Sequence, residues 1–347
     1  GFGLWIEPEM VNKDSNLFRE HPDWVLADSR RNYCHSRNQY VLDFSKSEVV
    51  DHIHRQIRKV LGEANISYVK WDMNRSFSEV FSNGKDRSWQ GKARHQYILG
   101  VYSLYERLTQ EFPDILFESC ASGGARFDPG ILYYAPQGWT SDDTDAVERI
   151  KIQYGTSYVY PLSSMGSHVS ASPNHQLYRH TSLETRANVA YFGTFGYELD
   201  LTELSEEELL TMKGQISFMK RYRELIQGGV FYRIKNPFEH NSSAWMVVSK
   251  DQTEALAAYF RVLQPTQAGF ERIRLAGLRA DWEYAVTEEM GGELPEGTEQ
   301  CLGEDRHFGD ELMYGGLSVS DVSSGLRGVA REKQGDFLSR LFHLKKI

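Results

Sequence analysis

A lysine and an aspartate stand two residues apart at the end of an apolar run, in the segment Tyr68-Val-Lys70-Trp-Asp72-Met-Asn74-Arg75. If this run is a β-strand, the alternation of its side chains places Lys70 and Asp72 on the same face. An ammonium group beside a carboxylate keeps that carboxylate ionised, and an ionised carboxylate can act as a nucleophile. A buried ion pair with a purely structural role would give the same pattern. The segment therefore offers Asp72 either as a nucleophile or as half of an ion pair.

A second acidic segment, Trp139-Thr-Ser-Asp142-Asp143-Thr-Asp145, also follows a strand-like run. Carboxylates crowded this closely cannot all be buried and ionised, so at least one needs a partner or a raised pKa, which suits a proton donor. For Asp143 and Asp145 we favour the capping of a helix that begins near Val147. A calcium-binding loop is a further alternative, but the segment lacks the glycine and the distal glutamate of the EF-hand loop.

Two carboxylates at different strand ends of one parallel barrel are the groups that glycoside hydrolysis needs, with one as nucleophile and the other as acid and then base. The distance between the two carboxyl groups decides the stereochemical outcome. About 5 to 5.5 Å accompanies retention of configuration, and about 6.5 to 9.5 Å accompanies inversion. The sequence leaves this distance open, and Asp72 with Asp142 is the candidate pair.

Small residues follow a third strand-like run, in the segment Cys120-Ala-Ser-Gly123-Gly-Ala-Arg126. They let a ligand approach the backbone closely. The segment lacks the lysine and the spacing of a phosphate-binding loop. Taken alone, Cys120 would be assigned to the core as a small apolar residue.

Three further side chains could contact a ligand. Trp5 and Trp139 stand near strand ends, where an indole ring either stacks on the apolar face of a sugar or packs in the core. Arg37 lies in a polar stretch without helical periodicity, which leaves its guanidinium free to reach a hydroxyl or a carboxylate.

The elements that must position these residues alternate between strand and helix over about the first 225 residues, which predicts a parallel sheet, closed or open, with ligand groups at the carboxyl ends of its strands. The expected strands are 2–7, 66–72, 114–120, 137–141, 158–161 and 193–198, and the expected helices are 48–61, 94–112 and 206–227. Ser45 with Glu48, and Ser205 with Glu208, have the spacing of capping boxes at two of these helices. Gly62 is the expected C-cap of the first helix.

After Gly229 the pattern changes to short alternating runs, which predict an antiparallel β-sandwich. The expected strands are 230–234, 244–249, 255–262, 273–278, 282–287, 312–317 and 339–344, with turns at Gly291-Gly292 and Gly315-Gly316. We therefore expect two domains, an α/β domain over 1–227 and a β domain over 228–347.

The composition narrows the possible partners. The 347 residues carry a formal net charge of −9 at pH 7, and an excess of acid repels nucleic acid backbones and anionic membranes. No apolar run reaches the roughly 18 residues of a membrane-spanning helix, and no signal peptide opens the sequence. Three cysteines without a C-x-x-C pair argue against a disulfide framework or a thiolate metal site. We expect a cytoplasmic protein that needs no metal or organic cofactor and binds neither nucleic acid nor membranes.

Four motifs occur in the order Gly3-Leu-Trp-Ile-Glu-Pro-Glu-Met-Val11, Lys70-Trp-Asp-Met-Asn-Arg75, Cys120-x-x-Gly123-x-x-Arg126 and Trp139-Thr-Ser-Asp142. Together they resemble the α-galactosidases of glycoside hydrolase family 36, and the resemblance extends over essentially the whole chain. It implies the release of terminal α-linked galactose from oligosaccharides such as melibiose and raffinose, with retention, by double displacement. It also implies a (β/α)8 TIM-type barrel followed by an antiparallel β-sandwich.

The resemblance also implies roles for individual residues. Asp72, at the end of the fourth barrel strand, matches the nucleophile, and Asp142, after the sixth strand, matches the acid/base residue. The positions that match the lining of the galactose pocket are Trp5, Arg37, Lys70, Cys120, Gly123 and Trp139. To this set we add Asn74, which lies in the same motif as the nucleophile.

The chain departs from the family pattern at its beginning. Family members usually open with a large β-domain and two further barrel strands, the second ending in an Asp-Asp-Gly-Trp motif that holds the axial hydroxyl of galactose. Gly1 corresponds to the start of the third strand, so we expect strands three to eight and a fragment of an enzyme that is a homo-oligomer. The alternatives are a galactosyl transglycosylase of the raffinose or stachyose type, a non-catalytic sugar-binding fragment and a structural scaffold.

Overall fold

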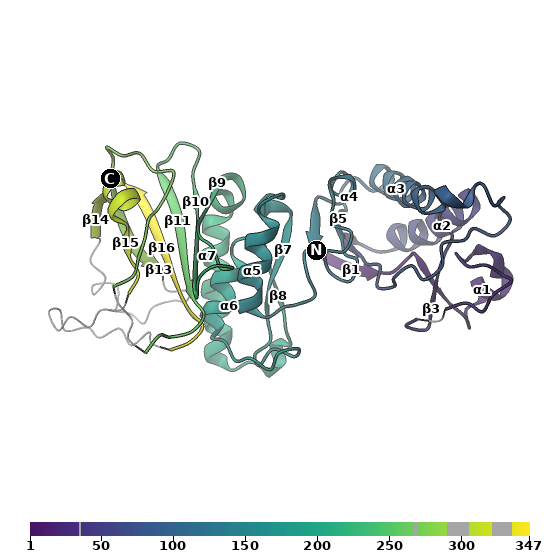
Figure 1. The fold of residues 1–347 in the computed structure, drawn as a ribbon, viewed down its shortest axis with the longest axis horizontal. Helices are drawn as coiled ribbons and strands as arrows, with labels where there is room; N and C mark the ends of the chain where they lie inside the picture. The colour runs from purple at the N-terminus through teal and green to yellow at the C-terminus, as the bar shows by residue number, and fades with distance from the viewer. Residues whose placement is uncertain (35, 267–269, 290–304, 321–334) are drawn as a thin grey trace. The chain divides into compact units, whose positions relative to one another are not determined.

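The computed structural model of the chain describes residues 1–34, 36–266, 270–289, 305–320 and 335–347. The chain divides into two compact units, Gly1–Asp142 and Asp143–Ile347 (Figure 1). Asp72 and Asp142 both belong to the first unit, so the candidate pair lies within one body.

Four parallel strands form the sheet of the first unit, in the order β1, β4, β5 and β6. Their bounds are β1 (Phe2–Ile6), β4 (Ile66–Trp71), β5 (Leu116–Ser119) and β6 (Gln137–Trp139). The helices α2 (Ser47–Glu63) and α3 (Ala93–Glu111) lie side by side and share the core of this sheet (Figure 1). Because parallel strands all run the same way, the ends of β4, β5 and β6 meet at one edge of the sheet.

The alternation of side chains along β4 separates a core face from the opposite face. Val69 and Trp71 are completely buried in the core that α2 and α3 cover. The ring of Trp71 stacks on Tyr105 of α3 with the centroids 4.0 Å apart. Lys70 and Asp72 therefore point to the other face of the sheet, as the strand pattern predicts.

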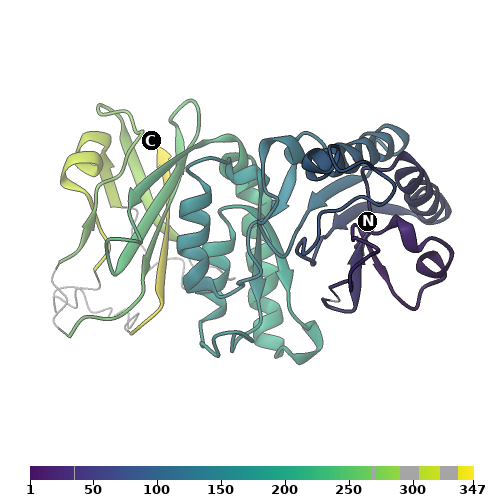
Figure 2. The same ribbon diagram turned by 45° about the vertical axis from the view of Figure 1, so that its right-hand side comes forward.

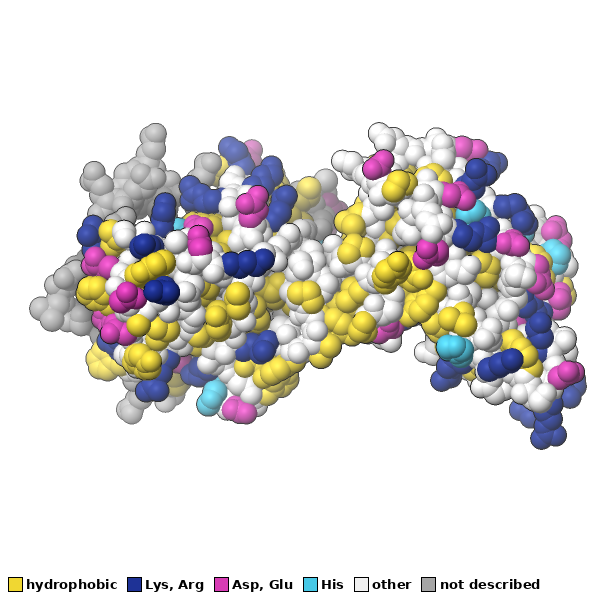
Figure 3. Space-filling model, turned by 90° about the horizontal axis from the view of Figure 1, so that it is seen from above, with side chains coloured by type: hydrophobic (Ala, Val, Ile, Leu, Met, Phe, Trp, Pro, Cys, Tyr) yellow, Lys and Arg dark blue, Asp and Glu magenta, His cyan; other side chains and the backbone are white. Residues whose placement is uncertain are grey.

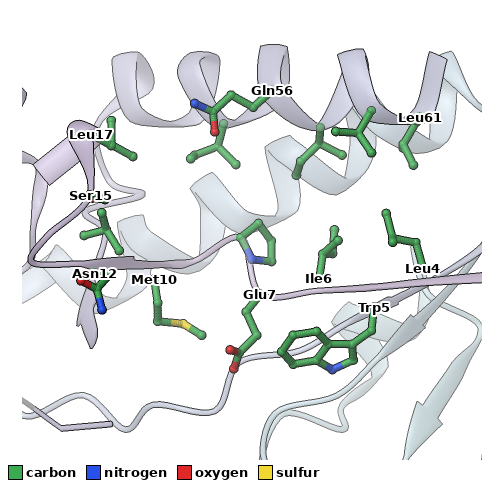
Figure 4. Close-up of a pocket in the computed structure, with 15 residues that line it drawn as sticks. Leu4, Trp5, Ile6, Glu7, Met10, Asn12, Ser15, Leu17, Gln56 and Leu61 are labelled. Atoms are coloured by element: carbon green, nitrogen blue, oxygen red, sulfur yellow. The ribbon is translucent and has the colours of Figure 1, made fainter. Parts of the chain in front are cut away.

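The remaining elements of the first unit are short: β2 (Met10–Asn12), α1 (Asn16–Glu20), η1 (Pro22–Trp24), β3 (Gln39–Val41), η2 (Gln90–Lys92) and α4 (Pro129–Leu132). A groove of about 520 Å³ lies between β1 and α2. Leu4 and Ile6 project into it toward α2, whereas Trp5 and Glu7 point away from the helix (Figure 4). The same alternation thus brings Trp5 and Glu7 to the face that carries Asp72.

The start of α2 differs from the prediction. Lys46, not Ser45, is the N-cap, and no side chain caps the helix. Ser45 instead bonds to the carboxylate of Asp43, which competes for the hydroxyl that a capping box requires. Gly62 lies inside the helix, which ends one residue later at Glu63.

The second unit begins with a parallel strand pair, β7 (Met165–Ser170) and β8 (Thr194–Glu198). Its helical elements are α5 (Ala146–Thr156), η3 (Leu162–Ser164), α6 (Leu183–Ala190), η4 (Leu201–Glu203) and α7 (Glu206–Gly228).

The predicted strand at 158–161 is wrong, because these residues form the turn that ends α5. The sequence of β7, Met-Gly-Ser-His-Val-Ser, contains few of the β-branched and aromatic residues that mark strands, so it was not predicted. At α7 the capping box of Ser205 and Glu208 is confirmed.

The rest of the second unit is an antiparallel sheet in the order β14, β13, β16, β11, β10 and β9, with β12 and β15 as a separate pair. The bounds are β9 (Val230–Lys235), β10 (Ser242–Val248), β11 (Glu254–Arg261), β12 (Arg272–Ile273), β13 (Glu283–Glu289), β14 (Asp305–Phe308), β15 (Leu317–Ser318) and β16 (Leu338–Lys346). Figure 2 shows the long strands of this sheet beside the helices α5 to α7.

The predicted strand at 312–317 is mostly wrong, because Glu311–Gly315 is a π-helical turn that Asp310 caps. The predicted turn at Gly291-Gly292 lies outside the described residues.

On the face that Figure 3 shows, acidic and basic side chains are interspersed rather than separated by sign. Among the described helices, none is long and apolar enough to cross a membrane.

Candidate active site

Asp72 follows directly after β4 and is 6% exposed. The indole Nε1 of Trp5 and the amide Nδ2 of Asn74 donate to its Oδ2 at 3.2 and 2.7 Å, and the N–H of Met73 donates to Oδ1 at 2.8 Å. Burial raises the pKa of Asp72, but hydrogen bonds from Cys120, Asn74, Trp5 and Met73 together hold the pKa below its ordinary value. The carboxylate is therefore ionised and oriented, as a nucleophile requires.

Lys70 makes its ion pair with Glu118 rather than with Asp72. The distance from Nζ to Oε1 of Glu118 is 3.3 Å, and the ammonium also lies over the ring of Trp139, 4.6 Å from its centroid. Glu118 stands opposite Lys70 in the register of β4 and β5, which explains the pairing. The expectation that the lysine keeps Asp72 ionised is corrected: hydrogen bonds do so.

Glu118 was not predicted as part of the site. It is 2% exposed and accepts hydrogen bonds from the hydroxyl of Tyr68 and, at 3.2 Å, from Nε2 of Gln137. One signal in the sequence could have indicated its role: Glu118 is an acid inside an otherwise apolar predicted strand. A buried acid usually has a partner, so a cation on the neighbouring strand could have been expected. Its charge balances that of Lys70 on this face of the sheet.

The loop after β5 starts at Cys120, whose thiol is buried against Asp72. Burial, followed by the charge of Asp72, raises the pKa of Cys120 to about 12. The group therefore stays a neutral thiol at physiological pH and donates its hydrogen to the carboxylate. Ser122 in the same loop donates to Oδ1 of Asn74 at 3.1 Å, which ties the loop to a second neighbour of Asp72.

Gly123 brings this loop against the backbone that carries Asp142. Its φ angle is +78°, and a Cβ at this position would lie 2.8 Å from the backbone N of Asp142 and 2.8 Å from Cα of Ser141. Only glycine allows both the conformation and the approach. The loop of residues 120–126 therefore touches the side chain of Asp72 at one point and the backbone of Asp142 at another. Asp142 itself is exposed, as a residue that exchanges protons with a ligand needs to be.

Both parts of the chain match known protein families. Residues 1–229 match the family described as Melibiase, and residues 242–344 match the Glycosyl hydrolase family 36 C-terminal domain. The chain belongs to glycosyl hydrolase family 36. Within the family, it is 49% identical over 346 residues to alpha-galactosidase AgaA of Geobacillus stearothermophilus, a match that covers 100% of this chain and 44% of AgaA.

Solved family 36 structures have the same fold. Two variants of AgaA, one crystallised with raffinose and one with stachyose, each show a TM-score of 0.90 and 48% identity, and each match covers 100% of this chain and 45% of AgaA. The predicted fold, part of a TIM-type barrel followed by an antiparallel β domain, is confirmed. The chain spans less than half the length of the curated relatives it matches.

Several of the predicted pocket residues contact one another. Trp5, Asn74 and Cys120 surround Asp72, as described above. Trp5 is 52% exposed, whereas Trp139 is only 3% exposed and its ring lies beneath the ammonium of Lys70. The assignment of the nine residues to catalysis and binding stays a prediction.

Arg37 is not joined to Asp72 by any of these contacts. It is exposed, its φ angle is +54°, and its side chain makes no hydrogen bond or ion pair with a described residue.

Asp145 accepts hydrogen bonds from the N–H groups of Val147 and Glu148, both at 3.0 Å, at the start of α5. The helix-capping role favoured for it is thereby confirmed.

No cluster of three or more histidine, cysteine, aspartate or glutamate side chains that could hold a metal ion occurs within the described ranges.

Proposed function

We propose that the complete natural protein that carries this chain is a retaining α-galactosidase, which releases terminal α-linked galactose from oligosaccharides. The observation that carries the proposal is the environment of Asp72, a buried carboxylate held ionised by hydrogen bonds at a strand end, in a chain of family 36. Its relatives include proteins named alpha-galactosidase, and AgaA variants were crystallised with raffinose and with stachyose. We therefore propose galacto-oligosaccharides of this kind as substrates.

The same two complexes support the choice of residues. The AgaA variant crystallised with raffinose has an aspartate replaced by asparagine, and the variant crystallised with stachyose has another aspartate replaced by alanine. These two aspartates are separated by the same number of residues as Asp72 and Asp142. Replacing a reacting carboxylate is a usual way to keep a substrate intact in a crystal, which favours both assignments.

The reaction would follow a double displacement. The carboxylate of Asp72 attacks the anomeric carbon while the bond to the leaving oxygen breaks, and protonated Asp142 gives its proton to that oxygen. A β-galactosyl ester forms. Asp142, now ionised, takes a proton from water, which attacks the same carbon, and the ester bond breaks to return Asp72 as a carboxylate. Galactose leaves with the α configuration of the substrate.

Azide separates the two roles. With an aryl α-galactoside, Asp72→Gly should regain activity in azide and form β-galactosyl azide, because azide replaces the missing nucleophile. Asp142→Gly should form α-galactosyl azide, because azide attacks the ester that Asp72 still makes. Asp143→Asn is the control and should behave as the natural protein does. Formation of α-galactosyl azide by Asp72→Gly would refute the assignment of Asp72 as the nucleophile. So would turnover by Asp72→Gly without azide that equals the turnover of the natural protein.

The products of the natural protein with raffinose test the reaction class. Free galactose as the main product supports hydrolysis. Larger oligosaccharides at the expense of galactose would show a transglycosylase, and galactose binding without turnover would show a sugar-binding protein.

We also propose a cytoplasmic location. Cys34 is exposed and unpaired, and such a thiol persists most readily in a reducing compartment. Fractionation of the natural host tests this, and recovery of the protein outside the cytoplasm would refute it.

A further inference from the structure

The sequence motif after β1 places a carboxylate in the core of the first unit. Glu9 is 0% exposed. Nε1 of Trp71 donates to its Oε1 at 2.7 Å, and Nη2 and Nη1 of Arg126 donate to Oε1 and Oε2 at 2.8 and 2.9 Å. The hydroxyl of Tyr97 also donates to Oε2. This side chain is thus a completely buried anion that receives four hydrogen bonds.

Burying the ion pair of Glu9 and Arg126 costs free energy, because both charges lose their hydration, and well-packed apolar side chains often stabilise a fold at least as well. The other contacts of Glu9 suggest that the pair has a role besides stability. Trp71 directly precedes Asp72, and its carbonyl accepts a hydrogen bond from the N–H of Cys120 at 2.8 Å. Arg126 closes the loop that begins at Cys120. Glu9 thus joins the end of β4 to the end of the loop of residues 120–126.

That loop is the connection between the two proposed catalytic residues. Its start, Cys120, donates to the carboxylate of Asp72, and its middle, Gly123, packs against the backbone N of Asp142. A planar guanidinium that donates two hydrogen bonds to one carboxylate fixes orientation as well as distance. Loss of the ion pair at Arg126 would remove the side-chain anchor at the far end of the loop, three residues after Gly123.

We propose that the ion pair of Glu9 and Arg126 is a positioning element, which holds the loop of residues 120–126 and through it sets the place of Asp142 relative to Asp72. The inference rests on the proposed function and adds residues that touch neither the substrate nor the reacting atoms. It predicts that loss of the pair impairs proton donation by Asp142 more than attack by Asp72.

The test compares leaving groups in the complete natural protein. Dinitrophenyl α-galactoside needs little proton donation, whereas melibiose depends on it. Glu9→Gln and Arg126→Lys should lower kcat/KM for melibiose by about ten- to hundredfold more than for the aryl galactoside, a part of the roughly 10²- to 10⁴-fold that a general acid contributes. Folded protein is quantified by circular dichroism, so that the rates refer to folded molecules.

A largely buried ion pair in the second unit, also with two hydrogen bonds between an arginine and a glutamate, provides the control. Arg340 donates to both carboxylate oxygens of Glu288, at 3.0 and 2.6 Å, and the two side chains are 11% and 6% exposed. Glu288→Gln should lower the melting temperature and leave the ratio of the two substrates unchanged. If Glu9→Gln does not fold, Arg126→Lys carries the comparison, because it keeps a charge beside Glu9 and removes only the paired donors.

The outcomes separate the two proposals. A changed substrate ratio in the folded variants supports the positioning role. An unchanged ratio, with both rates reduced equally or not at all, overturns it and leaves the proposed function intact. If the natural protein hydrolyses neither substrate, the proposed function fails and the positioning role fails with it.

Discussion

Asp72 depends on its hydrogen-bond donors more than on any neighbouring cation. Since burial alone would raise its pKa, the donors Cys120, Asn74, Trp5 and the N–H of Met73 decide that the folded value is lowered. A carboxyl whose pKa is lowered by folding contributes stability above its unfolded pKa, and this contribution is lost as the pH falls through the folded pKa. Nucleophilic activity should be lost in the same acidic range.

Removing one donor should shift this range. Asn74→Ala deletes the donor 2.7 Å from Oδ2, so the pKa of Asp72 should rise. The acidic limb of kcat/KM should then move to higher pH, by about half a unit to one unit. Asn236→Ala, at an asparagine of the second unit, is the control and should leave the limb in place. A pH profile of the Asn74 variant that matches the unaltered protein would contradict this account of the ionisation.

Gly123 offers a second test at the level of one residue. In Gly123→Ala the new methyl carbon would meet backbone atoms of Ser141 and Asp142, which cannot yield as a flexible side chain can. Gly84→Ala is the matched control, because Gly84 has a similar φ of +82° but nothing within 4 Å of the added carbon. Both variants should lose about 1–3 kcal/mol through backbone strain. Only Gly123→Ala should also lose kcat, at least tenfold; equal kcat values in the two variants would be inconsistent with the contact.

Among the elements, the helices with a clear apolar period were predicted best. α2, α3 and α7 lie within two residues of their predicted bounds, and β1, β4 and β8 follow the predicted strands closely. Elements without a period were missed: α6 is short and buried throughout most of its length, and β7 is rich in small polar residues. The cap motifs were predicted less well. At α2 the predicted capping box is absent, because the hydroxyl of Ser45 bonds to the nearby carboxylate of Asp43 instead.

The capping box at α7 can be tested by stability. Ser205→Ala removes an acceptor for the N–H of Glu208, and loss of such a cap costs about 1 kcal/mol. Ser47→Ala, at the first residue of α2, changes a serine that caps nothing and should alter the free energy of unfolding by less than about 0.5 kcal/mol. Urea unfolding of the two variants measures both values, and equal values would show that the cap of α7 contributes nothing.

For the molecule as a whole, the sequence motifs predicted the class of fold and proposed a candidate catalytic pair, but they did not predict the contacts that join distant segments. Lys70 pairs with Glu118 because two strands come into register, and the sequence does not specify that register. Glu9 was missed for the same reason, since its partners Trp71, Tyr97 and Arg126 lie far along the chain. Spacing within a motif is visible in a sequence, whereas pairing across a sheet is decided by packing.

We predict that Asp72 forms a covalent bond to the sugar. The complete natural protein, incubated with a fluorinated galactosyl fluoride that slows hydrolysis of the ester, should become inactive and gain the mass of one fluorogalactosyl group. Peptide mass spectrometry should then find that group on Asp72. A label on Asp142 or another residue, or inactivation without any covalent label, would contradict the account.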